Sequence, residues 1–212
     1  MQLASVDPWD PVKVHFTPLP WQLLGTGNYA AVFCHPEHPH VVVKVYAPGR
    51  EGFEEEVQVY ALLGSHPSFS QCFYADNGFL VLRRLYGMTL YDCVHQGTFI
   101  PQQAIDDIDH ALNYARSKGL RPHDVHGRNV MVQQGRGVIV DVSDFLKIEV
   151  CSVWEDLKRA YYGIYLPIFS RLPWGIPYWC LAIVRKVYRQ YRRTLALLGI
   201  GIKRSANVKP EC

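Results

Sequence analysis

The segment from His123 to Val132 combines polar residue types at a spacing that suits phosphoryl chemistry. Asp124 and Asn129 lie five positions apart in a loop that leads into an apolar run, and Asp141 ends a second apolar run. Phosphoryl transfer to a hydroxyl needs one carboxylate near the acceptor, and an amide plus a second carboxylate can hold Mg²⁺. Each piece occurs often by chance, so the prediction depends on the elements that position it.

A strand, a glycine-rich turn and a second strand are predicted upstream of this loop. Trp21–Leu24 and Ala31–Phe33 flank the turn Gly25–Ala30, and Val41–Tyr46 is a third strand rich in β-branched residues. The two glycines of the turn let backbone N–H groups approach phosphate oxygens without obstruction by a Cβ atom. An isolated Gly-x-Gly more often forms a plain hairpin than a phosphate-binding loop, so this turn alone does not predict nucleotide binding.

Lys44 lies inside the third strand, and a helix is predicted from Glu51 to Leu63. The helix carries an apolar stripe at 3.6-residue spacing, formed by Phe53, Val57, Tyr60 and Ala61. Glu56 lies beside this stripe, and an acid near a buried face needs a cation, for which Lys44 is the nearest candidate in sequence. The alternative is a solvated lysine and a solvated run of glutamates.

Three further elements separate this helix from the polar loop. Phe79–Leu82 is a predicted strand, Leu90–Val94 begins a short helix, and Pro101–Lys118 is a longer amphipathic helix that ends at Gly119. The apolar face of the long helix comprises Ile105, Ile108, Leu112 and Ala115. No internal repeat or low-complexity linker is present, so the short segment Arg83–Gly87 has to join the two halves.

In this order the motifs resemble the protein-kinase fold, and most closely the small bacterial eukaryotic-like serine/threonine protein kinases. The resemblance covers about Trp21 to Tyr165 and is carried by Gly25-x-Gly27-x-x-Ala30-x-Val32, Lys44, Glu56, His123-Asp124-x-x-x-x-Asn129 and Asp141. It implies an α+β, bilobal protein-kinase-like fold, with an antiparallel sheet and one helix in the N-lobe and a mainly helical, reduced C-lobe. The expected division is an N-terminal extension (1–20), the N-lobe (21–86), the C-lobe with the catalytic loop (87–165), a basic amphipathic segment (166–202) and a tail (203–212).

The resemblance also implies a role for each motif residue, with ATP and Mg²⁺ as cofactors. Asp124 would orient the acceptor hydroxyl or accept its proton, Lys44 held by Glu56 would contact the α- and β-phosphates, and Asn129 and Asp141 would hold Mg²⁺. The residues expected to cover the triphosphate are Gly25, Thr26, Gly27, Asn28, Tyr29 and Ala30. The adenine would be hydrogen-bonded by the backbone from Arg83 to Leu85 and flanked by Val32 and by Met131 or Val132.

Several positions depart from the kinase pattern. Ala30 replaces the third glycine of the loop, and Asp141-Val142-Ser143 stands where kinases carry Asp-Phe-Gly. His126 occupies a position where protein kinases often carry lysine, as in the aminoglycoside and choline kinase type. If protonated, it would assist the γ-phosphate; otherwise it hydrogen-bonds the loop backbone. No Ala-Pro-Glu follows Asp141, so the activation segment looks truncated, and Asp156 is either the acid that caps the catalytic loop or a surface acid.

Composition places the chain among ordinary folded proteins. It has 212 residues, 49% of them hydrophobic, and a formal net charge of +3. Six scattered cysteines favour free thiols in a reducing cytosol, and the N-terminus lacks a signal-peptide pattern. The apolar stretch Tyr161–Val184 contains Arg171 and three prolines, so no transmembrane span is expected. We therefore expect a cytoplasmic protein, with peripheral membrane attachment as an alternative.

A basic amphipathic helix is predicted from Pro177 to Leu198. One face carries Leu181, Val184, Tyr188, Tyr191 and Leu195, and the other carries Arg185, Lys186, Arg189 and Arg193, with Arg192 at the boundary. The basic face around Arg185–Arg193 could contact an anionic membrane or nucleic acid, although packing of the apolar face on the C-lobe is the more common arrangement. The His-rich run Cys34–His40 is interpreted as a hairpin connection rather than a metal site.

Three classes of function remain open from the sequence. The first is ATP- and Mg²⁺-dependent phosphoryl transfer to serine or threonine hydroxyls of a protein. The second is a kinase for a small-molecule or sugar hydroxyl, suggested by His126-Gly127 and the short activation segment. The third is a nucleotide-binding pseudokinase, which the presence of the lysine, both carboxylates and the asparagine disfavours.

Overall fold

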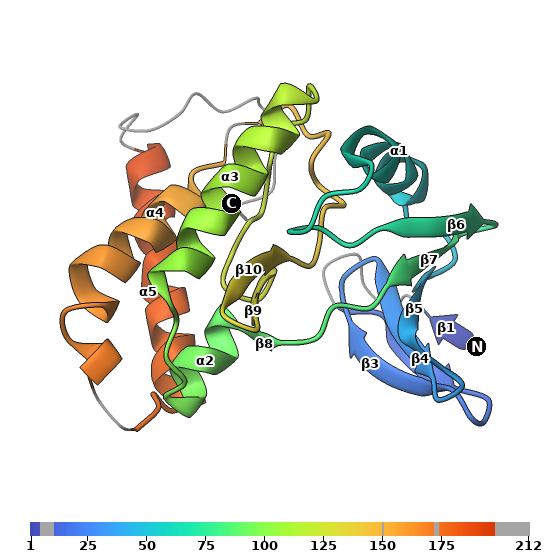
Figure 1. Cartoon of the computed structure of the whole chain (residues 1–212), viewed down its shortest axis with the longest axis horizontal. Coiled ribbons are helices and arrows are strands. Elements are labelled where there is room, and N and C mark those ends of the chain that lie inside the picture. Colours follow the sequence, from blue (N-terminus) through green and yellow to red (C-terminus); the bar gives the residue numbers. More distant parts are fainter. Residues whose placement is uncertain (5–10, 150, 172–173, 198–212) are drawn as a thin grey trace.

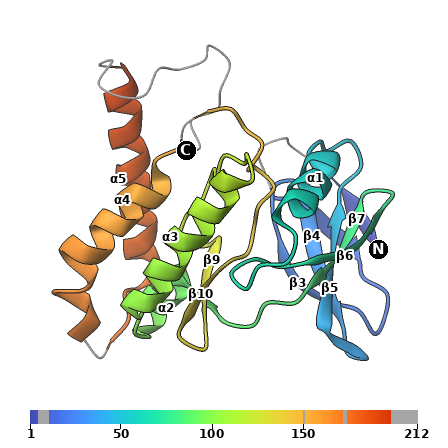
Figure 2. The same ribbon diagram turned by 45° about the horizontal axis from the view of Figure 1, so that its top comes forward.

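The computed structural model describes residues 1–4, 11–149, 151–171 and 174–197, and the predicted tail (203–212) lies outside them. Figure 1 shows a sheet with one helix on the right and a helical lobe on the left, joined by the segment that follows β7. The bilobal α+β architecture expected from the motifs is confirmed. Figure 2 shows the same two-lobed arrangement from a second direction.

The N-lobe is a five-stranded antiparallel sheet with the order β3-β4-β5-β7-β6. Its strands are β3 (Gln22–Thr26), β4 (Ala30–His35), β5 (His38–Tyr46), β6 (Cys72–Asp76) and β7 (Phe79–Arg83). β5 lies in the middle of the sheet, where Lys44 is opposite Val32 on one side and Leu80 on the other. A central strand is hydrogen-bonded on both edges, so the backbone that carries Lys44 is held firmly.

Helix α1 (Phe53–Leu63) packs on this sheet with a face that agrees with the predicted one at Phe53, Val57 and Tyr60 but not at Ala61. Its buried residues are Glu56, Val59, Tyr60 and Leu63, whereas Ala61 is exposed. The predicted stripe was therefore wrong at Ala61, because it was built from apolar residues alone. A glutamate belongs to the buried face, since its carboxylate is paired inside the lobe.

The N-terminal extension folds back onto the outer part of the sheet. β1 (Gln2–Ala4) and β2 (Lys13–Phe16) form a separate antiparallel pair. Val12 is buried with Ala31, Phe33 and Ala47 in a small second core cluster. The extension thus covers apolar side chains of β4 that the main core does not reach.

The C-lobe is built around helix α3 (Gln102–Ser117), and the face predicted for it is fully buried: Ile105, Ile108, Leu112 and Ala115. Its other elements are β8 (Met88–Thr89), α2 (Leu90–Gln96), β9 (Val130–Gln133), β10 (Arg136–Ile139), α4 (Val153–Ala160), a π-helical turn (Tyr161–Tyr165), a short 3-10 turn (Phe169–Arg171) and α5 (Tyr178–Leu197). β8, β9 and β10 form a small antiparallel sheet between α3 and the N-lobe (Figure 1).

The β9–β10 hairpin lies directly against α3, and Gly137 makes this approach possible. A Cβ atom on Gly137 would lie 2.1 Å from the carbonyl oxygen of Ala104, which no side chain could tolerate. Asp107 accepts hydrogen bonds from the Gly137 N–H (3.0 Å) and from the Arg136 guanidinium (2.6 and 2.8 Å). The hairpin that carries the polar loop at one end is therefore clamped to the most buried helix of the lobe.

Two general expectations can be compared with the structure. Within the described residues, no helix is long and apolar enough to cross a membrane. Cys34, Cys72, Cys93 and Cys180 are free thiols as expected, whereas Cys151 is disulfide-bonded, so the expectation of free thiols was wrong there.

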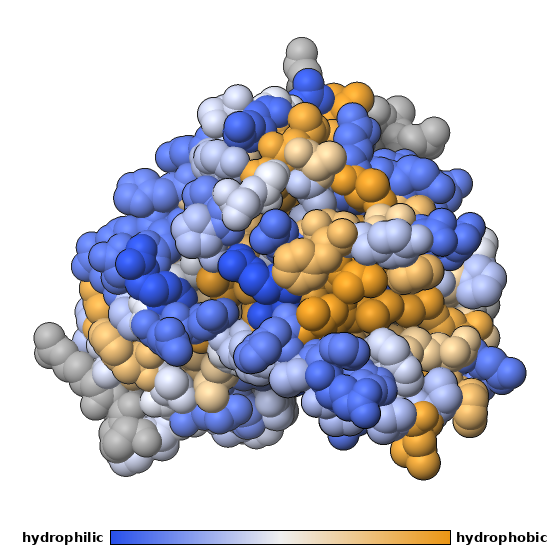
Figure 3. Space-filling model, turned by 45° about the vertical axis from the view of Figure 1, so that its right-hand side comes forward, coloured by the Kyte–Doolittle hydropathy of each residue, from blue (hydrophilic) through white to orange (hydrophobic). Residues whose placement is uncertain are grey.

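In Figure 3, which brings the N-lobe forward, hydrophobic residues gather in the right half of the view and hydrophilic residues cover much of the left half.

We expect Asp107→Asn to destabilise the protein by about 1–2 kcal/mol at neutral pH. The Arg136 guanidinium lowers the pKa of Asp107 from 3.8 to about 2. A lowered folded-state pKa stabilises the protein above the unfolded value, and this contribution is lost as the pH falls from about 4 towards about 2. Urea unfolding at neutral pH and at about pH 3 should therefore show a gap between wild type and variant that narrows in acid.

The matched control is Asp106→Asn, on the neighbouring position of the same helix. Among the residues that the structure describes, the Asp106 carboxylate accepts only a long hydrogen bond from the Tyr162 hydroxyl (3.4 Å), so its variant should stay within about 0.5 kcal/mol of wild type. Equal losses for the two variants, or a gap that does not narrow in acid, would contradict the role assigned to Asp107.

Candidate active site

Lys44 lies at the junction of the two lobes and contacts a carboxylate from each. Its Nζ atom is 2.8 Å from Glu56 on α1 and 3.2 Å from Oδ1 of Asp141, which follows β10. The Lys44 side chain is 12% exposed and that of Glu56 is fully buried, whereas Asp141 is 39% exposed. The contact between Lys44 and Glu56 expected from the sequence is present, and Asp141 adds a bridge between the lobes.

The charges in this cluster depend on one another. Burial opposes the charge on Lys44, but Asp141 and Glu56 outweigh it and raise the pKa of Lys44. Burial also opposes the charge on Asp141, yet Lys44 and the N–H of Ser143 outweigh it and lower the pKa of that carboxyl. Burial raises the pKa of Glu56, and the Lys44 ammonium counteracts this rise. Lys44 is therefore a protonated cation at neutral pH, held in place rather than free to rotate.

Tyr46 completes the cluster, and sequence reasoning missed it. Its hydroxyl donates a hydrogen bond to Oε2 of Glu56, so both oxygens of that carboxylate have partners. The signal in the sequence was the spacing, because residues two apart on a strand share one face and Tyr46 follows Lys44 by two positions. Tyr46 therefore acts with Lys44 to hold Glu56 inside the N-lobe.

The loop that follows α3 carries Asp124 in an unusual backbone conformation. Asp124 has φ of +55°, in the left-handed region that non-glycine residues rarely adopt. The carboxamide N–H of Asn129 donates to the Asp124 carbonyl (3.0 Å), as does the backbone N–H of His126 (3.0 Å). Strained conformations persist where surrounding contacts impose them, and here the contacts come from Asn129 and His126.

Asn129 and Asp141 are brought together by the β9–β10 hairpin. The backbone N–H of Val140 donates to the Asn129 carbonyl (2.9 Å), which ties the end of one strand to the start of the other. The Asn129 amide nitrogen is used by Asp124, so its side-chain oxygen is the atom left for a ligand. Lys44 and Ser143 occupy Oδ1 of Asp141. An amide oxygen and a carboxylate oxygen are hard donors that suit Mg²⁺, so the residues fit the metal that the motifs imply.

His126 lies beside Asp124, and its environment favours the neutral ring. Partial burial lowers the pKa of His126. Its Nδ1 atom accepts a hydrogen bond from the backbone N–H of Arg128 (3.3 Å), which leaves the proton on Nε2, 3.8 Å from Oδ2 of Asp124. Of the two interpretations left open by the sequence, a histidine that hydrogen-bonds the loop backbone agrees with these contacts.

The glycine-rich turn between β3 and β4 is open on its outer side. A Cβ atom on Gly25 would meet no atom within 4 Å, and Gly25, Thr26 and Gly27 are exposed. The Gly27 N–H is used within the turn, where it donates to the Ala30 carbonyl (2.8 Å). The side chain of Ala30 is 4% exposed and packed in the main core, so only the backbone of this residue could face a phosphate, and its assignment to the turn that covers the triphosphate stays a prediction.

Of the residues expected around an adenine ring, Arg83 does not fit. Its backbone N–H donates to the Gln71 carbonyl (2.8 Å), and its own carbonyl accepts from the Ser70 hydroxyl (2.7 Å). The assignment of Arg83 was wrong because β7 continues through this residue and its peptide groups are already paired. Within the described residues we find no hydrogen bond of the Leu85 backbone, so Leu85 remains the candidate.

The apolar residues of the predicted adenine site come from both lobes. Val32 on β4 is half-buried at the edge of the main core. On β9, Val130 is buried in that core, so strand alternation places the half-buried Met131 on the opposite face. The two residues remain candidates for flanking the ring.

Asp156 does not cap the catalytic loop. Its carboxylate accepts from the Tyr188 hydroxyl (2.7 Å), and it pairs with Arg192 (3.3 Å) and Arg159 (3.2 Å). That interpretation of Asp156 was wrong, because among the described residues its side chain is used by Arg159 on α4 itself and by Tyr188 and Arg192 on α5, whose position the sequence does not reveal.

The sequence similarity of one curated relative shows the family of the chain. No protein-family model matches the chain. The curated protein "Putative serine/threonine-protein kinase YrzF" of Bacillus subtilis (strain 168) is 31% identical over 172 residues, which is 79% of each chain. The kinase domain of Mycobacterium tuberculosis PknI aligns with a TM-score of 0.46 and 21% identity, covering 68% of this chain and 63% of that domain.

The fold and the lysine–carboxylate cluster define a protein-kinase-like protein. The chain belongs to the bacterial protein-kinase-like family represented by the Bacillus relative, and kinase-like phosphoryl transfer is the activity of that class.

We expect Glu56→Gln to lower the free energy of unfolding by about 2–3 kcal/mol, because removing one partner of a buried ion pair leaves the other poorly compensated. Glu55→Gln is the matched control, since Glu55 is the exposed neighbour on the same helix and should change stability by less than about 0.5 kcal/mol. Urea unfolding at neutral pH compares the two. Equal midpoints for both variants would show that the pairing of Glu56 contributes no net stability.

Proposed function

We propose that this chain transfers the γ-phosphoryl group of ATP, with Mg²⁺, to serine or threonine hydroxyls of a protein. The observation that carries the proposal is the contact of one lysine, Lys44, with Glu56 of the N-lobe and Asp141 of the C-lobe. The name of the Bacillus relative, "Putative serine/threonine-protein kinase YrzF", supports the choice of serine or threonine acceptors.

Lys44 and Asp141 would act on the nucleotide from opposite lobes. Lys44 is protonated and has its position fixed by Glu56, so it can donate to phosphate oxygens without losing much side-chain entropy. Asp141 and Asn129 would hold Mg²⁺, which neutralises charge on the transferring group. Asp141 would exchange part of its interaction with Lys44 for the metal.

Asp124 is the residue assigned to the acceptor hydroxyl. Its carboxylate is 31% exposed, next to the Nε2 atom of His126, and its backbone is held by Asn129. A carboxylate within hydrogen-bond reach of the hydroxyl can orient it and accept its proton. The residues therefore contribute positioning and charge, with no covalent step on the protein.

We expect Asp124→Asn to lower the rate of phosphoryl transfer by about 10²–10⁴-fold while leaving ATP affinity nearly unchanged.

We expect Asp141→Ala to lose transfer and to weaken Mg²⁺-dependent nucleotide binding, because it removes a metal ligand and a partner of Lys44. The measurement is transfer of the γ-³²P label to a generic basic protein, together with calorimetric titration of ATP with and without Mg²⁺.

Asp76→Asn is the control variant, because Asp76 lies on β6 and, among the described residues, its carboxylate accepts a side-chain hydrogen bond only from its neighbour Asn77. It should transfer phosphate as wild type does. Full activity of Asp124→Asn would refute the assignment of that residue, and binding without turnover by wild type would favour a pseudokinase.

One structural feature favours a second candidate, a kinase for a small-molecule hydroxyl. The whole connection from Asp141 to α4 consists of residues 142–152, which leaves little chain for a peptide-binding activation segment. Turnover of ATP in the presence of metabolite pools, with no label on protein, would support this candidate over a protein acceptor.

A further inference from the structure

Helix α5 leaves most of its apolar residues in solvent. Trp179, Ile183, Val187 and Tyr191 follow one another at four-residue spacing and are 66%, 53%, 61% and 58% exposed. Val184, beside them, is 63% exposed. Residues four apart lie on the same side of a helix, so these side chains form one continuous surface, here called the α5 apolar stripe.

The helix is attached to the C-lobe by a different and mostly polar edge. Tyr188 and Arg192 bond Asp156 on α4, and Tyr178 stacks on the ring of His95 on α2. Among the described residues, α5 contributes none to either hydrophobic core cluster. Val184 and Tyr191 therefore do not pack on the C-lobe as the sequence suggested. Their side chains stay exposed to solvent and can contact another surface.

Cations border the α5 apolar stripe on one side. At 100° per residue, Lys186, Arg189 and Arg193 fall within a narrow arc next to Trp179, and all three are exposed. The sequence from Tyr178 to Leu197 contains no acidic residue. An exposed apolar stripe with a basic border is the pattern of a helix that lies in the interface of an anionic membrane.

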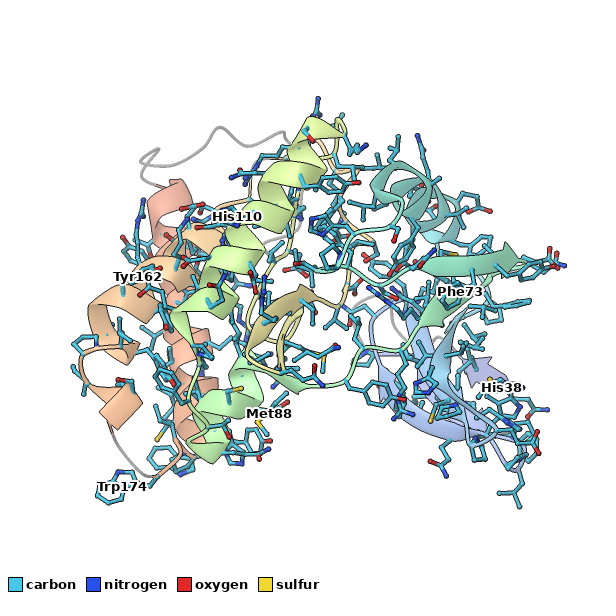
Figure 4. All side chains as sticks on the ribbon, in the orientation of Figure 1. His38, Phe73, Met88, His110, Tyr162 and Trp174 are labelled. Atoms are coloured by element: carbon cyan, nitrogen blue, oxygen red, sulfur yellow. The ribbon has the colours of Figure 1, made fainter. Side chains whose placement is uncertain are left out.

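The segment before α5 carries another exposed aromatic side chain. Trp174 is 69% exposed, and Figure 4 shows it at the lower left, close to the start of the helix. Tryptophan and tyrosine favour the headgroup level of a bilayer because one part of the ring is apolar and the other can hydrogen-bond.

We propose that the α5 apolar stripe and its basic border dock this protein on a phospholipid bilayer with anionic headgroups. Nucleic acid would satisfy the cations but not the aliphatic side chains of Ile183 and Val187, because interfaces with nucleic acid are polar and strongly positive. A bilayer provides partners for both groups of side chains. Acyl chains surround the apolar residues, and anionic headgroups pair with Arg189 and Arg193. Docking requires no rearrangement of the fold, because the stripe is already exposed.

The test is flotation of the full chain with vesicles of phosphatidylcholine alone or with one third phosphatidylglycerol. Wild type should bind the anionic vesicles and bind the neutral ones far more weakly. Arg189→Gln with Arg193→Gln should weaken binding by about 25-fold, at about fivefold for each cation removed. Ile183→Gln with Val187→Gln should weaken it by about tenfold or more.

Matched double variants elsewhere on the surface serve as controls. Leu19→Gln with Phe73→Gln removes exposed apolar residues of the N-terminal extension and the N-lobe, and Arg116→Gln with Lys118→Gln removes exposed cations at the end of α3. Both should bind vesicles as wild type does, and circular dichroism should show that all variants keep the same thermal midpoint.

Two results would overturn the proposal. One is the absence of binding to anionic vesicles at physiological salt. The other is binding that depends on the arginines but not on Ile183 and Val187, accompanied by tighter binding to a single-stranded RNA oligonucleotide. This experiment needs no phosphoryl transfer, so its outcome is independent of the function proposed above.

Discussion

A lysine ammonium buried at the junction of the lobes has to be compensated, and Lys44 is compensated by carboxylates that come from both. Glu56 lies on α1, which follows β5 closely in the sequence, whereas Asp141 follows the β9–β10 hairpin, 97 positions after Lys44. Removing water from a charge costs several kcal/mol unless a partner replaces it. The relative position of the two lobes is therefore an electrostatic requirement as much as a matter of apolar packing.

The C-lobe meets this requirement through contacts that never touch Lys44. Gly137 lets β10 approach α3, and Asp107 fixes that approach through the Gly137 N–H and the Arg136 guanidinium. Asn129 and Asp141 lie just outside the two ends of the hairpin that this clamp holds, and the bond between Val140 and Asn129 keeps them together. The positions of the two candidate metal ligands thus follow from packing on the least exposed helix of the lobe.

The order of the motifs predicted the two lobes, the strand that carries Lys44 and the helix α3, because these depend on local periodicity. The contact of Lys44 with Glu56 was predictable because a buried carboxylate requires a cation nearby. The buried face of α1 was not predictable from apolar residues, since Glu56 belongs to it. Arg83 and Asp156 were misassigned for a related reason. Their partners, Gln71 and Ser70 for one and Tyr188 and Arg192 for the other, are set by tertiary contacts that spacing does not encode.

The sequence also predicted that α5 is amphipathic and basic, but not which part of its circumference faces the protein. When the apolar residues of a helix cover a wider arc than its contact with the rest of the protein, the helix can pack in more than one rotation about its axis. Polar contacts then select one of these rotations. Here the bonds from Tyr188 and Arg192 to Asp156 turn the helix so that Ile183 and Val187 face outward. These contacts with Asp156, together with the stacking of Tyr178 on His95, therefore leave the apolar side of α5 as a surface rather than part of the core, which is the physical reason for treating that surface as a binding face.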